Sequence, residues 1–257
     1  MSLFEKDWIF NARKEQLIPE GDHWSTWLIM TGRGWGKTRT GAESVIESVR
    51  FGGVKRTHLI GRTVGDVRSV MIDGESGIVN CSPNDFRPHY SPSKRLLTWP
   101  NGSVALTFSS DSPEMLRGPQ CELLWADELG AWKRGDYAWS MAMFGLRLGK
   151  HPRAIITTTP RPRKFLRNIS KKKTTIITTG STKENKANLS SVFMQQIFDE
   201  YGGTSLGRQE LDGELLDEMP GAIFTRKSID ENRCSKVPDL IRIVVAVDPA
   251  VTAHEKS

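Results

Sequence analysis

The residues with the most distinctive chemistry form a glycine-rich segment, Thr-Gly-Arg-Gly-Trp-Gly-Lys-Thr, at positions 31–38. It follows an apolar run at 27–30 and precedes a helix-compatible segment from Arg39 to about Arg50. A strand, a glycine-rich turn and a helix in this order form a phosphate cradle, because the backbone N–H groups of the turn and the helix N-terminus point at the anion. We expect Lys37 to reach the terminal phosphates of a nucleotide and the Thr38 hydroxyl to hold Mg²⁺.

The segment departs from the general pattern G-x-x-x-x-G-K-[ST] at its first position, where Thr31 replaces glycine. A loop that contains Gly-Lys-Thr by chance is the alternative, but the flanking strand and helix favour a nucleotide site. We therefore predict that a nucleoside triphosphate is bound by the whole turn and the residue after it, namely Thr31, Gly32, Arg33, Gly34, Trp35, Gly36, Lys37, Thr38 and Arg39.

A pair of carboxylates, Asp127 and Glu128, ends the apolar stretch 123–126. Hydrolysis of a nucleotide needs a magnesium-holding carboxylate and a group that activates water. Asp127 is the candidate magnesium ligand, and Glu128 is the candidate base that orients and deprotonates water. Such pairs are common at solvated strand ends, but this one follows a phosphate loop and ends a buried strand. It favours an ATPase over a GTPase, because we find no guanine-reading Asn-Lys-x-Asp segment.

Three threonines end the next predicted strand, directly before Pro160. Their hydroxyls could hydrogen-bond the γ-phosphate or the attacking water and so report which nucleotide is bound. For Thr157 we prefer the simpler interpretation, which is that threonine suits a strand. For Thr158 and Thr159 we predict the sensing role.

Four further polar residues are candidates for contacts with the nucleotide. Arg117 lies on a tight turn before Asp127, and Arg33 lies inside the phosphate loop; either guanidinium could serve as an arginine finger on phosphate oxygens. The sequence does not separate these two. Arg13 could stack on adenine and Gln16 could read its edge, but from these residues alone we prefer the simpler interpretation, an exposed polar position on a helix.

The elements that must position these residues alternate between strands and helices, which predicts an α/β fold with a mostly parallel central sheet flanked by helices. Asn101-Gly102 predicts a hairpin between 96–100 and 104–108. From 188 to 217 the pattern is helical, with a break at Gly202-Gly203, and 219–238 is polar and turn-rich. The remaining predicted elements are helices at 1–20, 64–72 and 137–148 and strands at 27–30, 58–61, 123–126, 154–158, 174–178 and 241–249.

The composition is that of a soluble globular protein: 257 residues, 37% of them hydrophobic, with a net charge of +6. Three scattered cysteines have no metal-binding spacing and suggest reduced thiols. No apolar run is long enough to span a membrane. A local cluster of basic residues could contact DNA or form a solvated face, and both interpretations stay open. Its members are Arg161, Arg163, Lys164, Arg167 and Lys171 to Lys173.

Taken together, these segments resemble the large terminase subunit of tailed double-stranded DNA bacteriophages. The resemblance covers nearly the whole chain in the expected order, which is more specific than any one motif. It is carried by eight segments, which begin at Ala12 (ARKEQL), Gly32 (GRGWGKTR), Trp99 (WPNGS), Leu116 (LRGPQ), Trp125 (WADEL), Phe144 (FGLR), Thr157 (TTTPRP) and Gly207 (GRQEL).

The resemblance implies the ATPase domain of a DNA-packaging motor, with a P-loop fold of the ASCE type, a β-hairpin and a small helical lid. It implies ATP and Mg²⁺ as ligands. It would place Gln16 in the adenine-recognition motif, make Arg117 the finger that reaches a neighbouring subunit, and make Thr158-Thr159-Pro160 the coupling motif. A first position other than glycine, as at Thr31, is ordinary for terminases.

The implied partners are double-stranded DNA, the portal protein, the small terminase subunit and further copies of this chain in a ring, for which we expect a pentamer. We expect no membrane partner. The implied location is the host cell cytoplasm, with transient attachment to the procapsid portal. The implied boundaries are an ATPase core at 1–180, a lid at 181–220 and a linker at 221–240.

Residues 241–257 resemble the opening strand of a ribonuclease H-like nuclease domain, with Asp248 as its first metal-binding carboxylate. Because one carboxylate cannot hold a two-metal site, we expect an incomplete site and no nuclease activity from this chain. The sequence leaves two other functions open. One is a helicase-like nucleic-acid-dependent ATPase, and the other is a non-catalytic DNA-binding scaffold.

Overall fold

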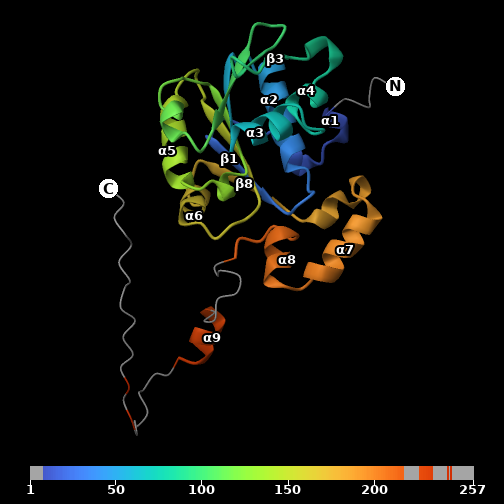
Figure 1. The fold of residues 1–257 in the computed structure, drawn as a ribbon, viewed down its shortest axis with the longest axis vertical. Helices are drawn as coiled ribbons and strands as arrows, with labels where there is room; N and C mark the ends of the chain where they lie inside the picture. Colours follow the sequence, from blue (N-terminus) through green and yellow to red (C-terminus); the bar gives the residue numbers. More distant parts are fainter. Residues whose placement is uncertain (1–7, 217–225, 234–241, 243, 245–257) are drawn as a thin grey trace. The chain divides into compact units, whose positions relative to one another are not determined.

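The computed structural model of the protein describes residues 8–216, 226–233, 242 and 244. The chain divides into two units, Met1–Pro220 and Gly221–Ser257. The first unit holds the sheet and the candidate site (Figure 1). In the second unit the described element is the helix α9 (Arg226–Glu231), which lies inside the region predicted to be a linker of turns.

The first unit is built on an eight-stranded sheet with the order β3-β4-β5-β2-β6-β7-β1-β8. All neighbouring strands are parallel except the β3–β4 and β4–β5 pairs. This confirms the predicted fold class. The strands are β1 (Thr26–Thr31), β2 (Arg56–Gly61), β3 (His89–Ser91), β4 (Leu96–Thr98), β5 (Val104–Ser109), β6 (Leu123–Asp127), β7 (Arg153–Thr158) and β8 (Thr175–Gly180).

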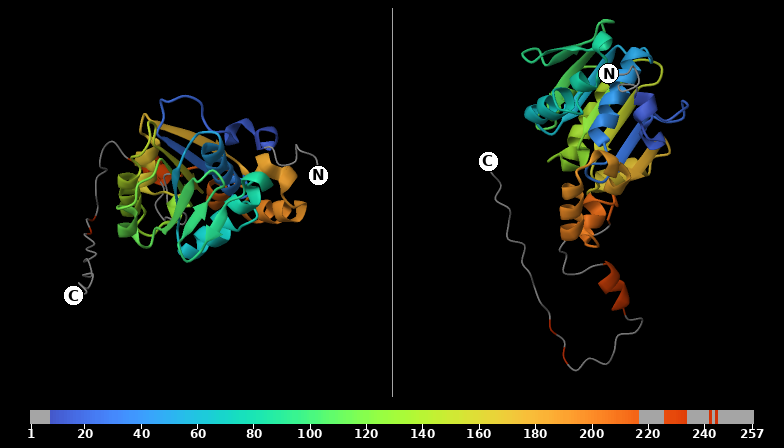
Figure 2. Two further views of the ribbon diagram at one scale, coloured as in Figure 1. Left: turned by 90° about the horizontal axis from the view of Figure 1, so that it is seen from above. Right: turned by 90° about the vertical axis from the view of Figure 1, so that its right-hand side faces the viewer.

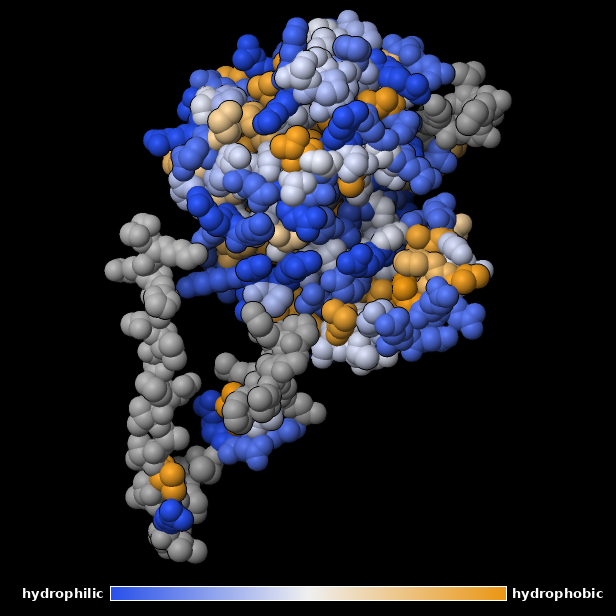
Figure 3. All heavy atoms as spheres, in the orientation of Figure 1, coloured by the Kyte–Doolittle hydropathy of each residue, from blue (hydrophilic) through white to orange (hydrophobic). Residues whose placement is uncertain are grey.

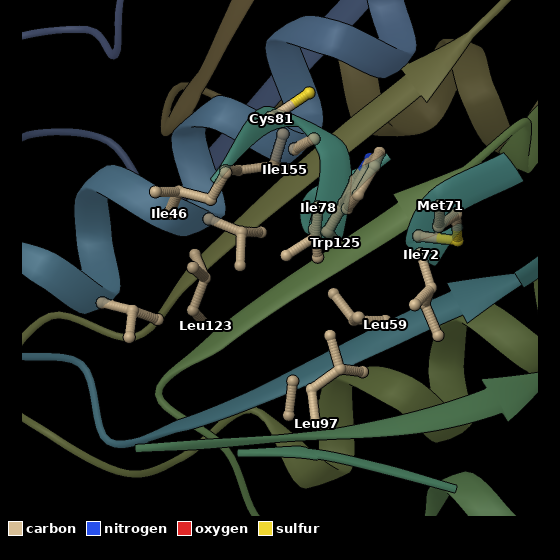
Figure 4. Packing of buried hydrophobic residues seen from close by; sticks show 14 of the residues in the cluster. Ile46, Leu59, Met71, Ile72, Ile78, Cys81, Leu97, Leu123, Trp125 and Ile155 are labelled. Atoms are coloured by element: carbon tan, nitrogen blue, oxygen red, sulfur yellow. The ribbon is translucent and has the colours of Figure 1, made fainter. Parts of the chain in front are cut away.

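Helices cover both faces of the sheet, which explains why its central strands are apolar on both sides (Figure 2). Successive residues of β1 point to opposite faces, so Trp27 and Ile29 join one apolar cluster while Leu28 and Met30 join the other. The first cluster includes residues of α2 (Lys37–Arg50) and α4 (Ile78–Cys81) packed on strand residues such as Trp125 (Figure 4). The second includes residues of α5 (Gly135–Gly145) and α6 (Lys164–Ser170).

The hairpin prediction is confirmed, since β4 and β5 pair in antiparallel orientation and Gly102 has a φ of +80° in the turn. The prediction of a helix at 64–72 is also confirmed. It begins as α3 (Val64–Asp66) and continues as a π-helical turn, η2 (Val67–Ile72). Short 3-10 turns η3 (Asn84–Phe86), η4 (Pro113–Leu116) and η5 (Leu129–Ala131) complete this part of the chain.

The prediction of one helix over residues 1–20 is wrong for its described part. A short helix α1 (Trp8–Asn11) is followed by a separate 3-10 turn η1 (Lys14–Gln16). Arg13 between them is extended, with φ −69° and ψ 153°. Its backbone N–H donates to the side-chain oxygen of Gln16 at 3.1 Å, so a side chain closes the turn in place of a continued helix.

The helical segment predicted at 188–217 contains α7 (Ser191–Tyr201) and α8 (Ser205–Glu210), which contact each other and are separated by the predicted Gly202-Gly203 break. A 3-10 segment, η6 (Thr182–Asn188), precedes them. The strand predicted at 241–249, with Asp248, lies outside the described residues apart from positions 242 and 244. Within the described residues, no helix has the length and apolar character needed to span a membrane.

Candidate nucleotide site

A cavity of about 1140 Å³ opens at the carboxyl ends of the central parallel strands, the edge where ligands bind in open α/β sheets. Eleven of the predicted site residues line it. They are Arg13, Gln16, Arg33, Gly34, Gly36, Lys37, Thr38, Arg39, Asp127, Glu128 and Thr159. The phosphate loop and the acidic pair, which lie far apart in the sequence, therefore share one cavity.

The glycine-rich turn that joins β1 to α2 contains positions whose backbone conformation favours glycine. Gly34 and Gly36 have φ angles of +69° and +104°, in the left-handed region that favours glycine. Gly36 is the N-cap of α2, so the helix begins at Lys37 on the wall of the cavity. A Cβ atom on Gly32 would lie 2.2 Å from the carbonyl oxygen of Leu211, which therefore packs directly against the loop.

Lys37 places a buried ammonium group between the phosphate loop and the acidic pair. Its Nζ donates to the carbonyl oxygens of Thr31 and Gly32 at 3.2 and 3.1 Å and lies 4.0 Å from Glu128 Oε1. Burial lowers the pKa of Lys37, while the nearby carboxylates of Glu128 and Asp127 act in the opposite direction. A phosphate in the cavity would gain a charged partner that is already positioned.

Asp127 ends β6 as a buried carboxylate, and burial followed by repulsion from Glu128 raises its pKa to about 7. The hydroxyl of Thr157, directly across on β7, donates to Asp127 Oδ1 at 2.6 Å. The same hydroxyl accepts a bond from Trp125 Nε1 at 2.8 Å, which fixes its direction. Thr157 was predicted to be a threonine chosen only for strand propensity; the structure instead shows that it orients the candidate magnesium ligand.

Glu128 begins the turn after β6 in a left-handed conformation, with φ +48°. This conformation costs a non-glycine residue roughly 1–2 kcal/mol, so the surrounding contacts must hold it. Thr159 supplies two of them, because its backbone N–H and its hydroxyl donate to Glu128 Oε2 and Oε1 at 3.2 and 3.4 Å. The side chain of Glu128 is 38% exposed, so it remains accessible from the cavity.

Four predicted residues of the phosphate loop and of the end of β7 lie outside the cavity lining: Thr31, Gly32, Trp35 and Thr158. The Thr158 hydroxyl accepts from the backbone N–H of Gly130 at 3.0 Å and donates to the carbonyl of Thr159 at 2.9 Å, so it holds the turn after β6. Trp35 is fully buried, and its Nε1 donates to Glu184 at 2.9 Å. These last two residues, Thr158 and Trp35, support the loops that carry the site.

The two candidates for base recognition lie beside the phosphate loop. The Arg13 guanidinium stacks over the Trp35 ring at 4.6 Å and donates to the Trp35 carbonyl at 2.6 Å. Gln16 is buried, and its Nε2 donates to the hydroxyl of Thr40 at 3.0 Å. Both are therefore fixed in position, and neither is an ordinary exposed helix residue.

The candidate arginines differ in position. Arg33 is exposed at the cavity and pairs with Glu210 at 2.8 Å. Arg39 pairs with Glu43 at 2.7 Å. Arg117 is exposed outside the cavity lining, with its guanidinium 5.8 Å from the Phe144 ring.

Two further arginines line the cavity without having been predicted there. Arg62 directly follows β2, and Arg161 follows β7 by three residues. Both arginines could have been predicted from the sequence, because each follows a parallel strand and the carboxyl ends of such strands meet at one edge of the sheet.

The residues present fit Mg²⁺ bound together with a nucleotide. No group of three or more His, Cys, Asp or Glu side chains in the described ranges could hold a metal alone. Mg²⁺ commonly needs only one or two protein carboxylates and takes its other oxygens from phosphates and water. Asp127 and the hydroxyl of Thr38, on the wall of the same cavity, are such oxygen donors.

The mostly parallel sheet, the glycine-rich turn between β1 and α2 and the acidic pair at the end of β6 define an α/β domain of the P-loop class. The family model described as the T4likevirus-type terminase large subunit, N-terminal, matches residues 28–231, so the chain belongs to this family of large terminase subunits. This confirms the resemblance found in the sequence.

Solved structures of large terminases share the fold. A large terminase from a thermophilic bacteriophage aligns with a TM-score of 0.60 and 13% identity, over 82% of this chain and 52% of that one. The large terminase of bacteriophage HK97 aligns with a TM-score of 0.56 and 16% identity, over 83% and 50%. The ATPase domain of the Thermus phage P74-26 large terminase aligns with a TM-score of 0.54 and 12% identity, over 77% and 94%.

This chain thus spans about half of the thermophilic-bacteriophage and HK97 proteins and nearly all of the P74-26 ATPase domain. The thermophilic-bacteriophage terminase has also been solved in complex with ADP and with ATP-gamma-S. No curated protein matches the chain by sequence.

Proposed function

We propose that this chain is the ATP-hydrolysing motor domain of a viral DNA-packaging terminase, which couples Mg-ATP hydrolysis to translocation of double-stranded DNA into a capsid. The observation that carries the proposal is the shared cavity of Lys37, Thr38, Asp127 and Glu128. Membership in the large terminase family supports packaging over the helicase-like alternative.

Each residue has a defined task in this proposal. Lys37 binds the terminal phosphates, and Glu128 orients a water molecule and accepts its proton. Thr159 keeps Glu128 directed along the end of β7. Asp127 and Thr38 would hold Mg²⁺, which when bound would neutralise charge that develops on the phosphates.

The partners that follow from this function are also proposals. They are double-stranded DNA, the portal protein, the small terminase subunit and further copies of this chain in a ring. The host cell cytoplasm is the corresponding location. The division into a core at 1–180 and a lid at 181–220, with Asp248 opening a nuclease domain, belongs to the same proposal.

The direct test is to replace the proposed base and to measure ATP binding and turnover separately. Glu128→Gln should bind ATP normally but hydrolyse it about 10²–10⁴-fold more slowly, because a positioned base is removed. Lys37→Ala should lose ATP binding. The control is Glu20→Gln, which makes the same change at an exposed residue outside the cavity lining. Wild-type turnover by Glu128→Gln would rule out the proposed mechanism and favour a non-catalytic scaffold.

The positions of the two arginines predict different kinetics. Arg33 is at the cavity of its own chain, whereas Arg117 is exposed outside that cavity lining, a position that suits contact with a neighbouring subunit's nucleotide. We propose that Arg117 acts in trans. Arg117→Ala should then remove the rise in turnover per chain that assembly produces, and Arg33→Ala should lower turnover at every concentration. The measurement is ATP turnover per chain against protein concentration. If turnover by Arg117→Ala still rises with concentration as it does in the wild type, the arginine finger is Arg33 or another residue.

A further inference from the structure

The fold divides the basic run at 161–173 between two edges of the sheet. Arg163 and Lys164 follow β7 at the carboxyl edge, where α6 begins. That helix ends at Ser170, and Thr175, the first residue of β8, pairs with Thr26, the first residue of β1. Because β1 and β8 are parallel, residues 171–173 lie at the opposite, amino edge of the sheet. The run is therefore not one surface.

At the carboxyl edge the structure assembles a different basic surface from two segments. Lys133 and Arg134 follow β6, the neighbour of β7, and so lie beside Arg163 and Lys164. All four residues are exposed. Lys133, Arg163 and Lys164 line a cavity of about 350 Å³ that also contains Asp136, and the surface over α6 is hydrophilic (Figure 3). We call Lys133, Arg134, Arg163 and Lys164 the carboxyl-edge patch.

The positive charges of this patch are not paired with carboxylates in the described part of the chain. Lys133, Arg163 and Lys164 form no ion pair or side-chain hydrogen bond with any described residue. Arg134 stacks over the Tyr137 ring at 4.9 Å, which leaves its charge exposed. Two carboxylates lie nearby, Asp136 in the cavity lining and Glu114 on the Tyr137 hydroxyl, so the four cations leave a local excess of positive charge that an anionic partner would neutralise.

The aromatic residues of the cavity narrow the class of partner. Trp132 is fully buried, and its Nε1 donates to the carbonyl of Asp127 at 3.0 Å, while Phe165 is only partly exposed. The cavity lining therefore offers neither an exposed aromatic platform for unpaired bases nor the aromatic anchor typical of protein interfaces, and the exposed ring beside it, Tyr137, is stacked with Arg134. The exposed groups of the patch are long cationic side chains, which suit contact with the sugar–phosphate backbone of a duplex.

We propose that the carboxyl-edge patch contacts the phosphate backbone of double-stranded DNA, independently of base sequence. This inference rests on the proposed packaging function and names the surface that it uses. Arg163 of the patch lies two residues after Arg161, which lines the nucleotide cavity. DNA bound to the patch would therefore contact the loop that carries Thr159.

The test compares two triple variants with the same loss of charge. One is Lys133→Ala, Arg163→Ala and Lys164→Ala; the control is Lys171→Ala, Lys172→Ala and Lys173→Ala at the opposite edge. Binding of each full chain to a fluorescent duplex of about 30 base pairs, long enough for several phosphate contacts, is measured without nucleotide at several salt concentrations. Thermal unfolding of each variant is measured alongside.

The patch variant should bind at least about tenfold more weakly at low salt. The slope of log K against log salt should fall by about 2–3, since each phosphate contact contributes roughly 0.9. The control should keep the wild-type affinity and slope. Equal weakening in both variants, unchanged binding in the patch variant, no duplex binding by the wild-type chain, or preference for a single strand would each overturn the proposal. Because no nucleotide is present, these results are independent of whether the chain hydrolyses ATP.

Discussion

The hydroxyl of Thr157 joins Trp125 to Asp127 and gives the candidate magnesium ligand a fixed direction. Groups that orient a metal ligand in this way typically change metal affinity by about 10–100-fold when removed. Thr157→Val keeps the shape of the side chain but removes the hydroxyl. We expect it to raise the Mg²⁺ concentration required for half-maximal ATP turnover by about tenfold or more.

The measurement is ATP turnover against Mg²⁺ concentration for the wild type, Thr157→Val and Thr157→Ser. The serine variant retains the hydroxyl and should remain close to the wild type. Removing the hydroxyl also leaves the buried N–H of Trp125 without its partner, which costs about 1–3 kcal/mol of stability. An unchanged Mg²⁺ requirement in a folded Thr157→Val protein would mean that Thr157 is only structural.

The sequence predicts a site residue when its role depends on neighbours along the chain, and not when it depends on how strands pair. Lys37 and Glu128 belong to short patterns of adjacent residues, so they could be predicted. The contact of Thr157 with Asp127 depends on the pairing of β6 with β7 in one register, which is non-local. The same applies to Arg62, whose place in the cavity depends on the position of β2 in the sheet.

At the scale of elements, the contact between α2 and β6 determines how closely the phosphate loop approaches the acidic pair. A Cβ atom on Gly41 of α2 would lie 2.3 Å from the Trp125 ring, which is fully buried. Gly41→Ala gains about 1 kcal/mol of helix propensity but overpacks a site where such changes cost about 1–3 kcal/mol. We expect net destabilisation of up to about 2 kcal/mol, measured by urea unfolding.

The control for this prediction is Gly65→Ala in α3. There the nearest atom to an added Cβ is the Thr63 hydroxyl oxygen, at 3.7 Å, which is ordinary contact. This variant should be neutral or slightly stabilising. A Gly41→Ala protein at least as stable as the wild type would show that α2 and β6 can move apart freely.

Elements with strong local signals were predicted, and those decided by contacts far along the chain were not. The Asn101-Gly102 hairpin and the apolar strands β1 and β6 carry such signals. The single helix expected over 1–20 is wrong at Arg13, which is extended and whose guanidinium donates to the side chain of Asn185 and to the carbonyl oxygen of Trp35, both far along the chain. The basic run at 161–173 was treated as one surface because the direction of α6 was not known.

At the scale of the whole molecule, His58 links stability to pH. It is buried on β2, and neither ring nitrogen has a hydrogen-bond partner among the described residues. Burial lowers its pKa to about 4 from the ordinary value of 6.5. Between these two values the unfolded chain holds more protons, so stability contributed by neutral His58 is complete above about pH 6.5 and falls as the pH is lowered.

From these two pKa values we expect His58 to lower the free energy of unfolding by about 2 kcal/mol between about pH 7 and pH 5. The measurement is urea unfolding of the wild type and of His58→Leu at both pH values. Asp127, whose pKa is raised, acts in the opposite direction, but its effect cancels in the difference between the two proteins. Equal pH dependence in both proteins would show that His58 is not protonated on unfolding.

The central claim is that the phosphate loop and the acidic pair act on one magnesium–nucleotide complex. A crystal structure with a non-hydrolysable ATP analogue and Mn²⁺ in place of Mg²⁺ would test it, because anomalous scattering locates the metal. We expect the metal beside the Thr38 hydroxyl and Asp127, with the terminal phosphate of the nucleotide at Lys37 and facing Glu128. A metal bound elsewhere, or a nucleotide whose phosphates lie away from Lys37, would contradict the account.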